Sequence, residues 1–221
     1  MKKILAGLLL SMFSLSLAAQ DVVHLERYAE RNAELPSNAR GRVVIIGDSI
    51  VEGWSERAHP GFFHNTRFVA RGISGEVTAQ MLLRFRADVV ALNPKTVVIM
   101  GGTNDIALNL GAYNEDYTFG NIVSMVEIAR ANRIKVVLTS VLPAAAYRWR
   151  PEVTDAPAKI ASLNARIRAY AEANHIPYID YWSALVAEDG VSMKSDYTSD
   201  GVHPLLAGYM VMEELLLLAV K

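Results

Sequence analysis

Five short runs of apolar residues recur along this chain of 221 residues, and they constrain its fold more than any other feature. In two of them, at 42–47 and 135–142, apolar and largely β-branched residues stand at consecutive positions. Consecutive apolar residues are typical of strands that are buried on both faces of a parallel sheet. The five predicted strands are 42–47, 67–72, 96–102, 135–142 and 177–181.

Segments with apolar residues at helical spacing separate these runs. They lie at 77–85, 122–129, 160–170 and 205–216, and a weaker amphipathic stretch lies at 22–35. Alternating strands and helices form right-handed crossovers that cover both faces of one sheet. The sequence therefore predicts a three-layer, doubly wound α/β fold with a five-stranded parallel sheet. We expect it to form a single domain over residues 20–221, a length sufficient to bury a substantial core.

Residues that could take part in catalysis follow these strands. Ser49 comes directly after the first, Gly72 ends the second, Asn104 follows the third, and Asp200 and His203 stand about twenty residues after the fifth. In open parallel sheets, ligands bind beyond the carboxyl ends of the strands. We therefore expect these five residues to face one crevice.

The residue types fit acyl transfer. A serine hydroxyl attacks at neutral pH only when a base takes its proton, and the imidazole of His203 suits that role. Asp200, three residues earlier, could orient the ring through a tight turn. The oxyanion formed on attack needs donors at ~2.7–3.1 Å. The backbone N–H groups of Ser49 and Gly72 and the side-chain amide of Asn104 could supply them.

Each of these residues alone has a structural interpretation. A Gly-Asp-Ser triplet such as 47–49 is more often a turn or a helix N-cap than a nucleophile, and we expect Asp48 to support the turn. Asn104 suits a helix start, and Pro204 after His203 suits the first position of a helix. The chemical interpretation depends on their joint order, because each group follows a strand.

Four segments, IIGDSIVEGW, RGISGE, GGTNDI and DGVHP, together resemble the conserved blocks of the GDSL/SGNH hydrolase superfamily over residues 43–204. The resemblance implies a flavodoxin-like α/β/α fold and serine esterase, lipase or acetylhydrolase activity without a metal or other cofactor. Ile50 stands where the family name has Leu, a change that conserves volume. The chain lacks the G-x-S-x-G elbow of α/β-hydrolases at this position.

The resemblance also implies roles by matched position. Ser49 is similar to the family nucleophile, His203 to its base and Asp200 to the acid of its triad. Gly72 and Asn104 are similar to its oxyanion donors.

The segment at 143–157 is the least regular part of the domain and is expected at the same end of the sheet. It is either a solvated connector with a packed tryptophan or one wall of the substrate site. Its aromatic and arginine side chains would suit a sugar ring or an acidic group better than a long acyl chain. The candidate substrate-binding residues are Tyr147 and Trp149, with Trp54 and Arg71 as weaker candidates.

Residues 1–19 resemble a signal peptide. Lys2 and Lys3 precede an apolar stretch over 4–17, and a small-x-small pattern ends at Ala18. At about 14 residues this stretch is shorter than the ~20 of a membrane-spanning helix, so cleavage is favoured over anchoring. The absence of cysteine excludes a lipidated-cysteine anchor and disulfides. We expect a periplasmic or secreted protein without stable membrane insertion.

The charge balance of 22 Lys+Arg against 23 Asp+Glu argues against nucleic acid as a partner. The favoured hypothesis is a serine esterase that removes short acyl groups from a small-molecule or glycan ester. One alternative is a lysophospholipase or thioesterase acting on longer acyl chains. The other is a noncatalytic carbohydrate-binding domain on the same scaffold.

Overall fold

A computed structural model describes residues 24–36, 41–64 and 66–221, so the predicted signal peptide lies outside the described residues. Five parallel strands form one sheet in the order β2-β1-β3-β4-β5. This is the flavodoxin-like order of doubly wound folds, in which the chain reverses its direction of travel between β1 and β3. The predicted fold class is therefore confirmed. The strands are β1 (Val43–Gly47), β2 (Phe68–Gly72), β3 (Thr96–Ile99), β4 (Lys135–Thr139) and β5 (Tyr178–Ile179).

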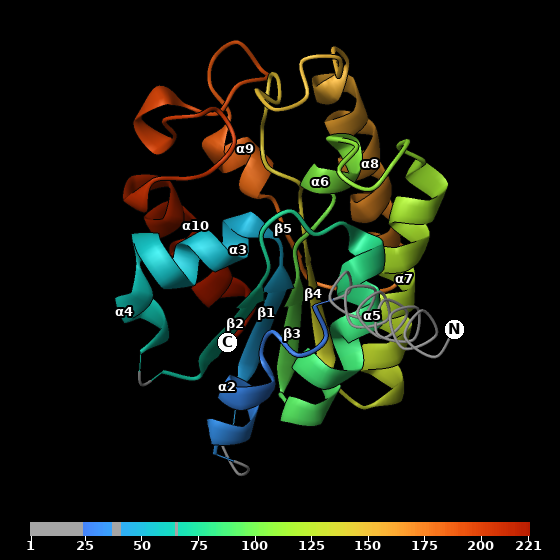
Figure 1. The fold of residues 1–221 in the computed structure, drawn as a ribbon, viewed down its shortest axis with the longest axis vertical. Coiled ribbons are helices and arrows are strands. Elements are labelled where there is room, and N and C mark those ends of the chain that lie inside the picture. The colour runs from blue at the N-terminus through green and yellow to red at the C-terminus, as the bar shows by residue number, and fades with distance from the viewer. Residues whose placement is uncertain (1–23, 37–40, 65) are drawn as a thin grey trace, which may run out of the picture.

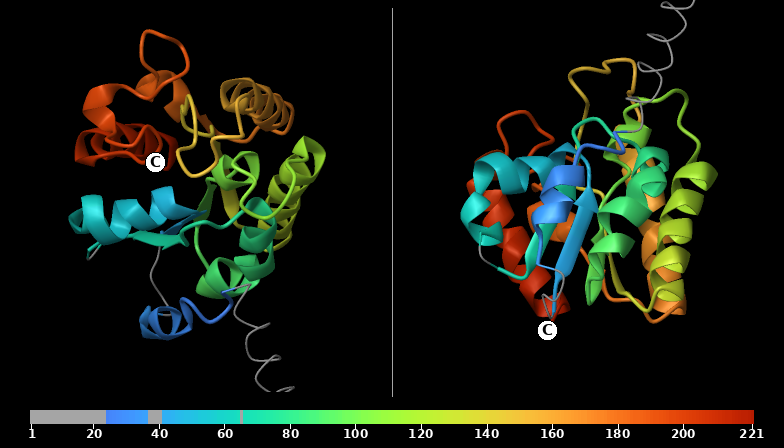
Figure 2. Two further views of the ribbon diagram at one scale, coloured as in Figure 1. Left: turned by 45° about the horizontal axis from the view of Figure 1, so that its top comes forward. Right: turned by 60° about the horizontal axis from the view of Figure 1, so that its bottom comes forward.

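Helices cover both faces of the sheet (Figures 1 and 2). One face carries α5 (Thr78–Asp88), α7 (Glu115–Ala131) and α8 (Ala156–Ala173), and the other carries α3 (Ser49–Gly53), α9 (Tyr181–Leu185) and α10 (Leu206–Ala219). Alternate residues of β1 enter the two cores, Val44 and Ile46 on the α5 side and Val43 and Ile45 on the α10 side. Burial on both faces explains why this strand is apolar at consecutive positions.

Short helical segments fill several connections between the longer elements. The predicted strands 96–102 and 135–142 end earlier than expected, because the chain leaves the sheet to form these loops. No helix within the described residues combines the length and the apolar character needed to cross a bilayer. The short segments are α4 (Pro60–Phe63), α6 (Thr103–Ile106), a π-helical turn at Trp54–Ala58 and 3₁₀ turns at Val90–Leu92 and Ser195–Tyr197.

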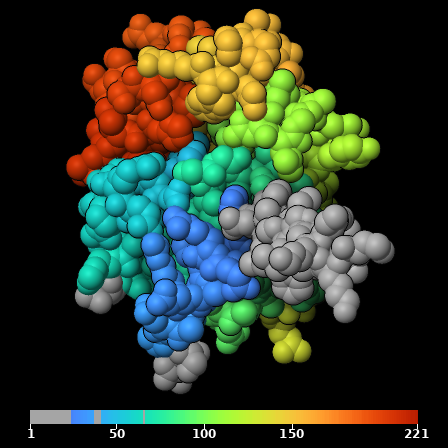
Figure 3. Space-filling view, viewed as in Figure 1, coloured from blue at the N-terminus to red at the C-terminus, as the bar shows by residue number. Residues whose placement is uncertain are grey.

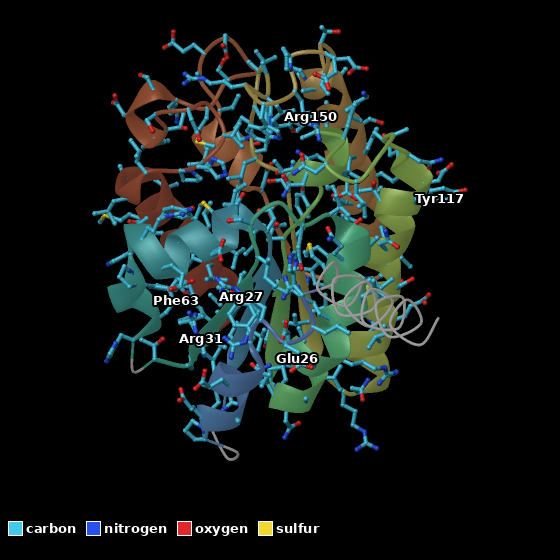
Figure 4. The ribbon with its side chains drawn as sticks, viewed as in Figure 1. Glu26, Arg27, Arg31, Phe63, Tyr117 and Arg150 are labelled. Atoms are coloured by element: carbon cyan, nitrogen blue, oxygen red, sulfur yellow. The ribbon has the colours of Figure 1, made fainter. Side chains whose placement is uncertain are left out.

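Of the predicted amphipathic stretch at 22–35, the structure describes residues 24–35, and there the helix is shorter than expected, α2 (Ala29–Glu34). Tyr28 just before it is buried and donates its hydroxyl hydrogen to the carbonyl of Gly72. Arg27 and Arg31, which Figure 4 labels beside this segment, pair with acidic residues of the chain that follows β1. The N-terminal segment thus covers the outer edge of β2, which as an edge strand would otherwise be open to pairing with another chain.

Candidate active site

Ser49 begins α3 immediately after β1 and is partly exposed. The Asp48 side chain caps this helix, because its Oδ1 accepts the N–H of Ile50 at 2.9 Å. Tyr209 of α10 donates its hydroxyl hydrogen to the carbonyl of Ile50 at 2.7 Å. The turn that ends β1 is thus held from both sides, and Ser49 stands at the carboxyl edge of the sheet.

Asp200 and His203 lie on one tight turn, as their spacing predicts. Oδ1 of Asp200 accepts the N–H groups of Val202 at 2.9 Å and of His203 at 2.8 Å. Gly201 between them has φ +87°, a conformation that glycine adopts without strain. Thr198 donates its hydroxyl hydrogen to the carbonyl of His203 at 2.8 Å, which closes the turn.

The turn places three side chains in one hydrogen-bonded line. His203 Nε2 lies 2.9 Å from Ser49 Oγ, and His203 Nδ1 lies 2.6 Å from Asp200 Oδ2. A ring protonated on Nδ1 donates to the carboxylate, which leaves Nε2 free to accept the serine proton. This arrangement has the geometry of a nucleophile, a base and an orienting acid.

The Asp200 carboxyl stays ionised in this setting. Burial alone would raise its pKa, but the hydrogen bonds from the His203 backbone, the His203 ring and the Val202 backbone lower the pKa to about 2. Above pH 4 it is therefore a full carboxylate that accepts the hydrogen bond from the Nδ1–H of His203.

Asn104 of α6 is buried, and its hydrogen bonds determine which way its amide points. Its Nδ2 donates to the carbonyl of Glu76 at 3.0 Å, and its Oδ1 accepts from Nδ2 of Asn109 at 2.8 Å. Oδ1 of Asn109 in turn accepts the indole N–H of Trp149 at 3.1 Å. Since a carbonyl only accepts and an indole N–H only donates, neither amide can be flipped without losing these bonds. The second Nδ2 hydrogen of Asn104 remains for another acceptor.

Trp149 connects the irregular loop to the base. Its ring stacks on the His203 ring with centroids 6.3 Å apart, and 41% of the residue is exposed. The space-filling view shows the segments that carry these two residues meeting at the top of the molecule (Figure 3). Trp149 is thus the one predicted substrate-binding residue that lies beside His203, and its role in substrate binding stays a prediction.

The other three predicted substrate-binding residues are buried, so this prediction is wrong for them. Trp54 is 0% exposed, and its indole N–H donates to Glu213 within the core on the α10 side. Tyr147 is also 0% exposed and belongs to the core on the opposite face. Arg71 is 4% exposed, and its guanidinium lies over the Tyr28 ring, at the outer edge of β2. The presence of an aromatic or basic residue near a loop does not determine whether its side chain points into the site or into the core.

Gly72 has a packing role that the sequence did not indicate. A Cβ at this position would lie 2.2 Å from the backbone nitrogen of Glu52 and 2.6 Å from the carbonyl oxygen of Asp48. Glycine therefore lets the end of β2 approach the start of α3.

The strand register directs the Gly72 N–H away from β1. On β2, the peptide groups that face β1 belong to residues 67, 69, 71 and 73, since Val43 N–H donates to Arg67 and Ile73 N–H donates to Gly47. The Gly72 N–H thus faces the outer edge, on the side of Tyr28. Its role as an oxyanion donor stays a prediction, and the orientation of the N–H does not support it.

Two residues near Asn104, Gly75 and Asn109, were not predicted as site residues. Gly75 has φ +83° in the turn at 72–76, and its N–H has no acceptor among the described residues. Asn109 donates to both the Gly75 carbonyl, at 3.3 Å, and Asn104. A second glycine in RGISGE was a signal for Gly75, whereas nothing in the sequence pointed to Asn109.

Asp48 is buried beneath this site, where burial disfavours the ionised form of its carboxyl group. Burial raises its pKa from 3.8 to about 6, although the Ile50 N–H and the nearby His203 oppose the shift. Within the described residues, no cluster of three or more His, Asp or Glu side chains is arranged to bind a metal ion.

Asp48→Asn is expected to remove a pH-dependent loss of stability. Because the folded-state pKa of Asp48 exceeds its unfolded-state value, the folded protein binds the proton more tightly, and raising the pH from 4 to 7 favours unfolding. A shift of about two pKa units corresponds to about 3 kcal/mol. Asparagine keeps the cap, so the free energy of unfolding of the variant, measured in urea, should gain on the parent by roughly this amount between pH 4 and pH 7.

Asp180, which caps α9, is the matched control. Bonds from Ser183 and Arg168 outweigh burial and lower its pKa, so its contribution to stability is present above the unfolded-state value and is lost towards acid pH. Asp180→Asn should therefore lose stability relative to the parent as pH rises, the opposite trend. Parallel pH profiles for Asp48→Asn and the parent would contradict the assigned pKa shift.

Known proteins share the fold of this chain. A crystal structure of a GDSL-like lipase from Bacteroides thetaiotaomicron is 54% identical and superposes with a TM-score of 0.87, covering 90% of this chain and 97% of that one. An acetylxylan esterase from Geobacillus stearothermophilus, 19% identical with a TM-score of 0.63, shares the fold over 85% of this chain and 97% of its own.

A curated relative, an uncharacterized lipoprotein from Bacillus subtilis, is 31% identical over 117 residues. The match covers 46% of this chain and about half of the relative, 48% of its length. Residues 45–211, which include the whole serine, histidine and aspartate line, match the GDSL-like lipase/acylhydrolase family. The chain belongs to this family of esterase-type hydrolases.

Proposed function

We propose that this protein is an exported serine esterase that removes short acyl groups, acetyl above all, from carbohydrates. The observation that carries the proposal is the line from Ser49 Oγ through His203 to Asp200, with distances of 2.9 and 2.6 Å. Family membership supplies the ester hydrolase class.

The proposed reaction has two steps. Ser49 Oγ attacks the ester carbonyl while its proton passes to His203 Nε2, and collapse of the tetrahedral intermediate releases the alcohol, which takes that proton. Water then attacks the acyl-enzyme, gives its proton to Nε2 and releases the carboxylic acid, with the proton returned to Ser49. Asp200 holds the Nδ1–H throughout and stabilises the ring when it is charged.

The oxyanion of both intermediates needs donors that are already in place. We assign two of them to the Ser49 N–H and to the free Nδ2 hydrogen of Asn104. For the third, the unpaired N–H of Gly75 is favoured over that of Gly72, because Asn109 ties the Gly75 peptide to Asn104 while Gly72 faces the outer edge.

A carbohydrate acceptor is favoured by the surface beside the base. The half-exposed Trp149 offers a flat apolar face next to His203, with the exposed Arg148 adjacent in the loop. An aromatic face with nearby polar groups suits a ring that is apolar on one face and bears hydroxyls at its rim. The acetylxylan esterase that shares this fold acts on such an acceptor, which makes acetylated xylan the first to test.

Export is proposed from the lysines and the short apolar stretch of the N-terminal segment. The relative named as a lipoprotein is in keeping with a protein that acts outside the cytoplasm.

One experiment tests both the nucleophile and the acyl preference. A fluorophosphonate probe should label the purified protein on Ser49, as located by peptide mass spectrometry. The kcat/KM for p-nitrophenyl esters should fall from acetate through butyrate to octanoate, and acetate should be released from acetylated xylan. A label on another residue would refute the nucleophile. Activity that rises with chain length would favour the lysophospholipase or thioesterase alternative.

Trp149→Ala is expected to raise KM for acetylated xylooligosaccharides about tenfold, which corresponds to the loss of ~1.4 kcal/mol of ring contact. The KM for p-nitrophenyl acetate should change by no more than about threefold, because this substrate has no sugar to stack. Trp149→Phe is the matched control, since it keeps an aromatic face and loses only the bond to Asn109. Equal changes in KM on both substrates would contradict sugar stacking.

A further inference from the structure

The most unusual buried group in the described part of the chain is Arg84 of α5, whose side chain is 0% exposed. Its guanidinium makes four hydrogen bonds. Nε donates to Glu76 at 2.6 Å and Nη1 donates to Asp88 at 3.0 Å. Nη2 donates to the carbonyls of Gly47 at 2.9 Å and Arg71 at 3.0 Å. One cation thus joins two buried carboxylates and the last carbonyls of two adjacent strands.

Stability is a poor explanation for this cluster. Moving charges out of water costs several kcal/mol each, and apolar residues of similar volume often stabilise a core as well or better. What apolar residues cannot do is fix the direction of two carbonyl groups. A planar guanidinium fork does this, and its bonds are strengthened by charge and by the low dielectric of the interior.

The carbonyls that Arg84 holds lie next to the proposed catalytic groups. Gly47 is two residues before Ser49 and ends β1. The Arg71 carbonyl belongs to the peptide that begins the turn at 72–76, which leads to Gly75. Arg84 therefore fixes the strand ends from which the nucleophile and a proposed oxyanion donor project.

The third connection runs through Glu76. Its carboxylate accepts from Arg84, while its backbone carbonyl accepts from Asn104 Nδ2 at 3.0 Å. The ion pair and the amide of Asn104 are thus anchored on one residue. The ends of β1 and β2 and the start of α6 meet at this pair.

We propose that Arg84, with Glu76, is a positioning residue for the esterase reaction. It acts by holding the β1 end, the 72–76 turn and Asn104 in the arrangement that stabilises the oxyanion. The inference rests on the proposed function. Arg84 acts only by positioning these groups, since it contacts no substrate and transfers no proton.

Arg84→Lys tests the fork separately from the charge. Lysine keeps a cation between the two carboxylates, but its single nitrogen cannot also reach both carbonyls. We expect kcat for p-nitrophenyl acetate, per site titrated with the fluorophosphonate, to fall 10- to 100-fold, roughly what a displacement of about 1 Å costs. KM should stay within about threefold, and the rate of fluorophosphonate labelling should fall with kcat, since the phosphonyl oxygen uses the same donors.

Asp88→Asn is the matched control. It weakens the same ion cluster at the end of α5, where Asp88 also accepts from Asn32, and it touches neither strand carbonyl. We expect a lower melting temperature with kcat within about twofold of the parent, because the guanidinium of Arg84 still holds both strand carbonyls. A kcat loss in Asp88→Asn equal to that in Arg84→Lys would overturn the proposal in favour of general destabilisation.

Glu76→Gln serves if Arg84→Lys does not fold. Glutamine keeps the size, a hydrogen-bond acceptor and the backbone carbonyl, and weakens the pairing with Arg84 and the longer contact with His24 Nδ1, at 3.4 Å. We expect kcat to fall at least fivefold with little change in KM. Parent values of kcat and labelling rate in either variant would overturn the inference. An inactive and unlabelled parent protein would instead refute the esterase function.

Discussion

Ser49→Ala is expected to hydrolyse p-nitrophenyl acetate about 10⁶-fold more slowly than the parent, judging from the loss of a serine nucleophile in a comparable triad. Alanine leaves His203 and Asp200 in place, but the ring then has no hydroxyl to activate. No acyl-enzyme can form, and the residual rate over water comes from the oxyanion donors alone. Fluorophosphonate labelling should disappear completely.

Ser55→Ala is the matched control for this variant. The Ser55 hydroxyl donates only to the carbonyls of Val51 and Glu52, at 3.3 and 3.4 Å, on the helical segment that begins at Ser49. It should retain parent activity and labelling. If Ser49→Ala kept more than about 1% of the parent kcat after an active-site titration that excludes contaminating esterases, Ser49 would not be the nucleophile.

Asp200→Asn is expected to lower kcat about 10⁴-fold with KM nearly unchanged. The two backbone N–H groups that donate to Oδ1 would hold the amide oxygen of asparagine there. Its NH₂ group would then face His203 Nδ1, which must act as acceptor, so that the ring proton moves to Nε2. A ring protonated on Nε2 cannot take the serine proton.

Asp189→Asn is the matched control for the turn. Asp189 Oδ1 also accepts two backbone N–H groups, from Val191 and Ser192, but no histidine contacts it. It should leave kcat unchanged. Because the pKa of Asp200 is held at about 2, the acid limb of the parent pH–rate profile between pH 4 and pH 8 should not arise from Asp200. Parent-like turnover in Asp200→Asn at pH 7 would refute its orienting role.

Much of the fold could be predicted because burial leaves a periodic signal in the sequence. The apolar run at 42–47 and the helical spacing of Ile160, Leu163 and Ile167 each report a surface that must be covered, whatever covers it. The boundaries were less predictable, since strands such as 96–102 end where the loop leaves the sheet. The extent of α2 was also overestimated, because contacts with β2 rather than helical periodicity determine that segment.

The candidate site was likewise predictable only in part. Asp200 and His203 are three residues apart, so a local turn could bring them together, and the distance of 2.6 Å agrees with that expectation. Trp54 and Tyr147 were misjudged because exposure depends on how distant segments pack. Asn109 and Arg84 were missed because their partners lie up to 40 residues away in the chain.

The amino-acid sequence thus indicates the fold class, the polar groups at the ends of the strands and the chemistry proposed for Ser49, His203 and Asp200. These follow from local periodicity, short turns and residue type. Packing alone decides which side chains reach the site and how they are held. Trp149 lies beside His203, Tyr147 is in the core, and Arg84 holds the ends of β1 and β2. Each of these depends on contacts between elements that only the folded chain brings together.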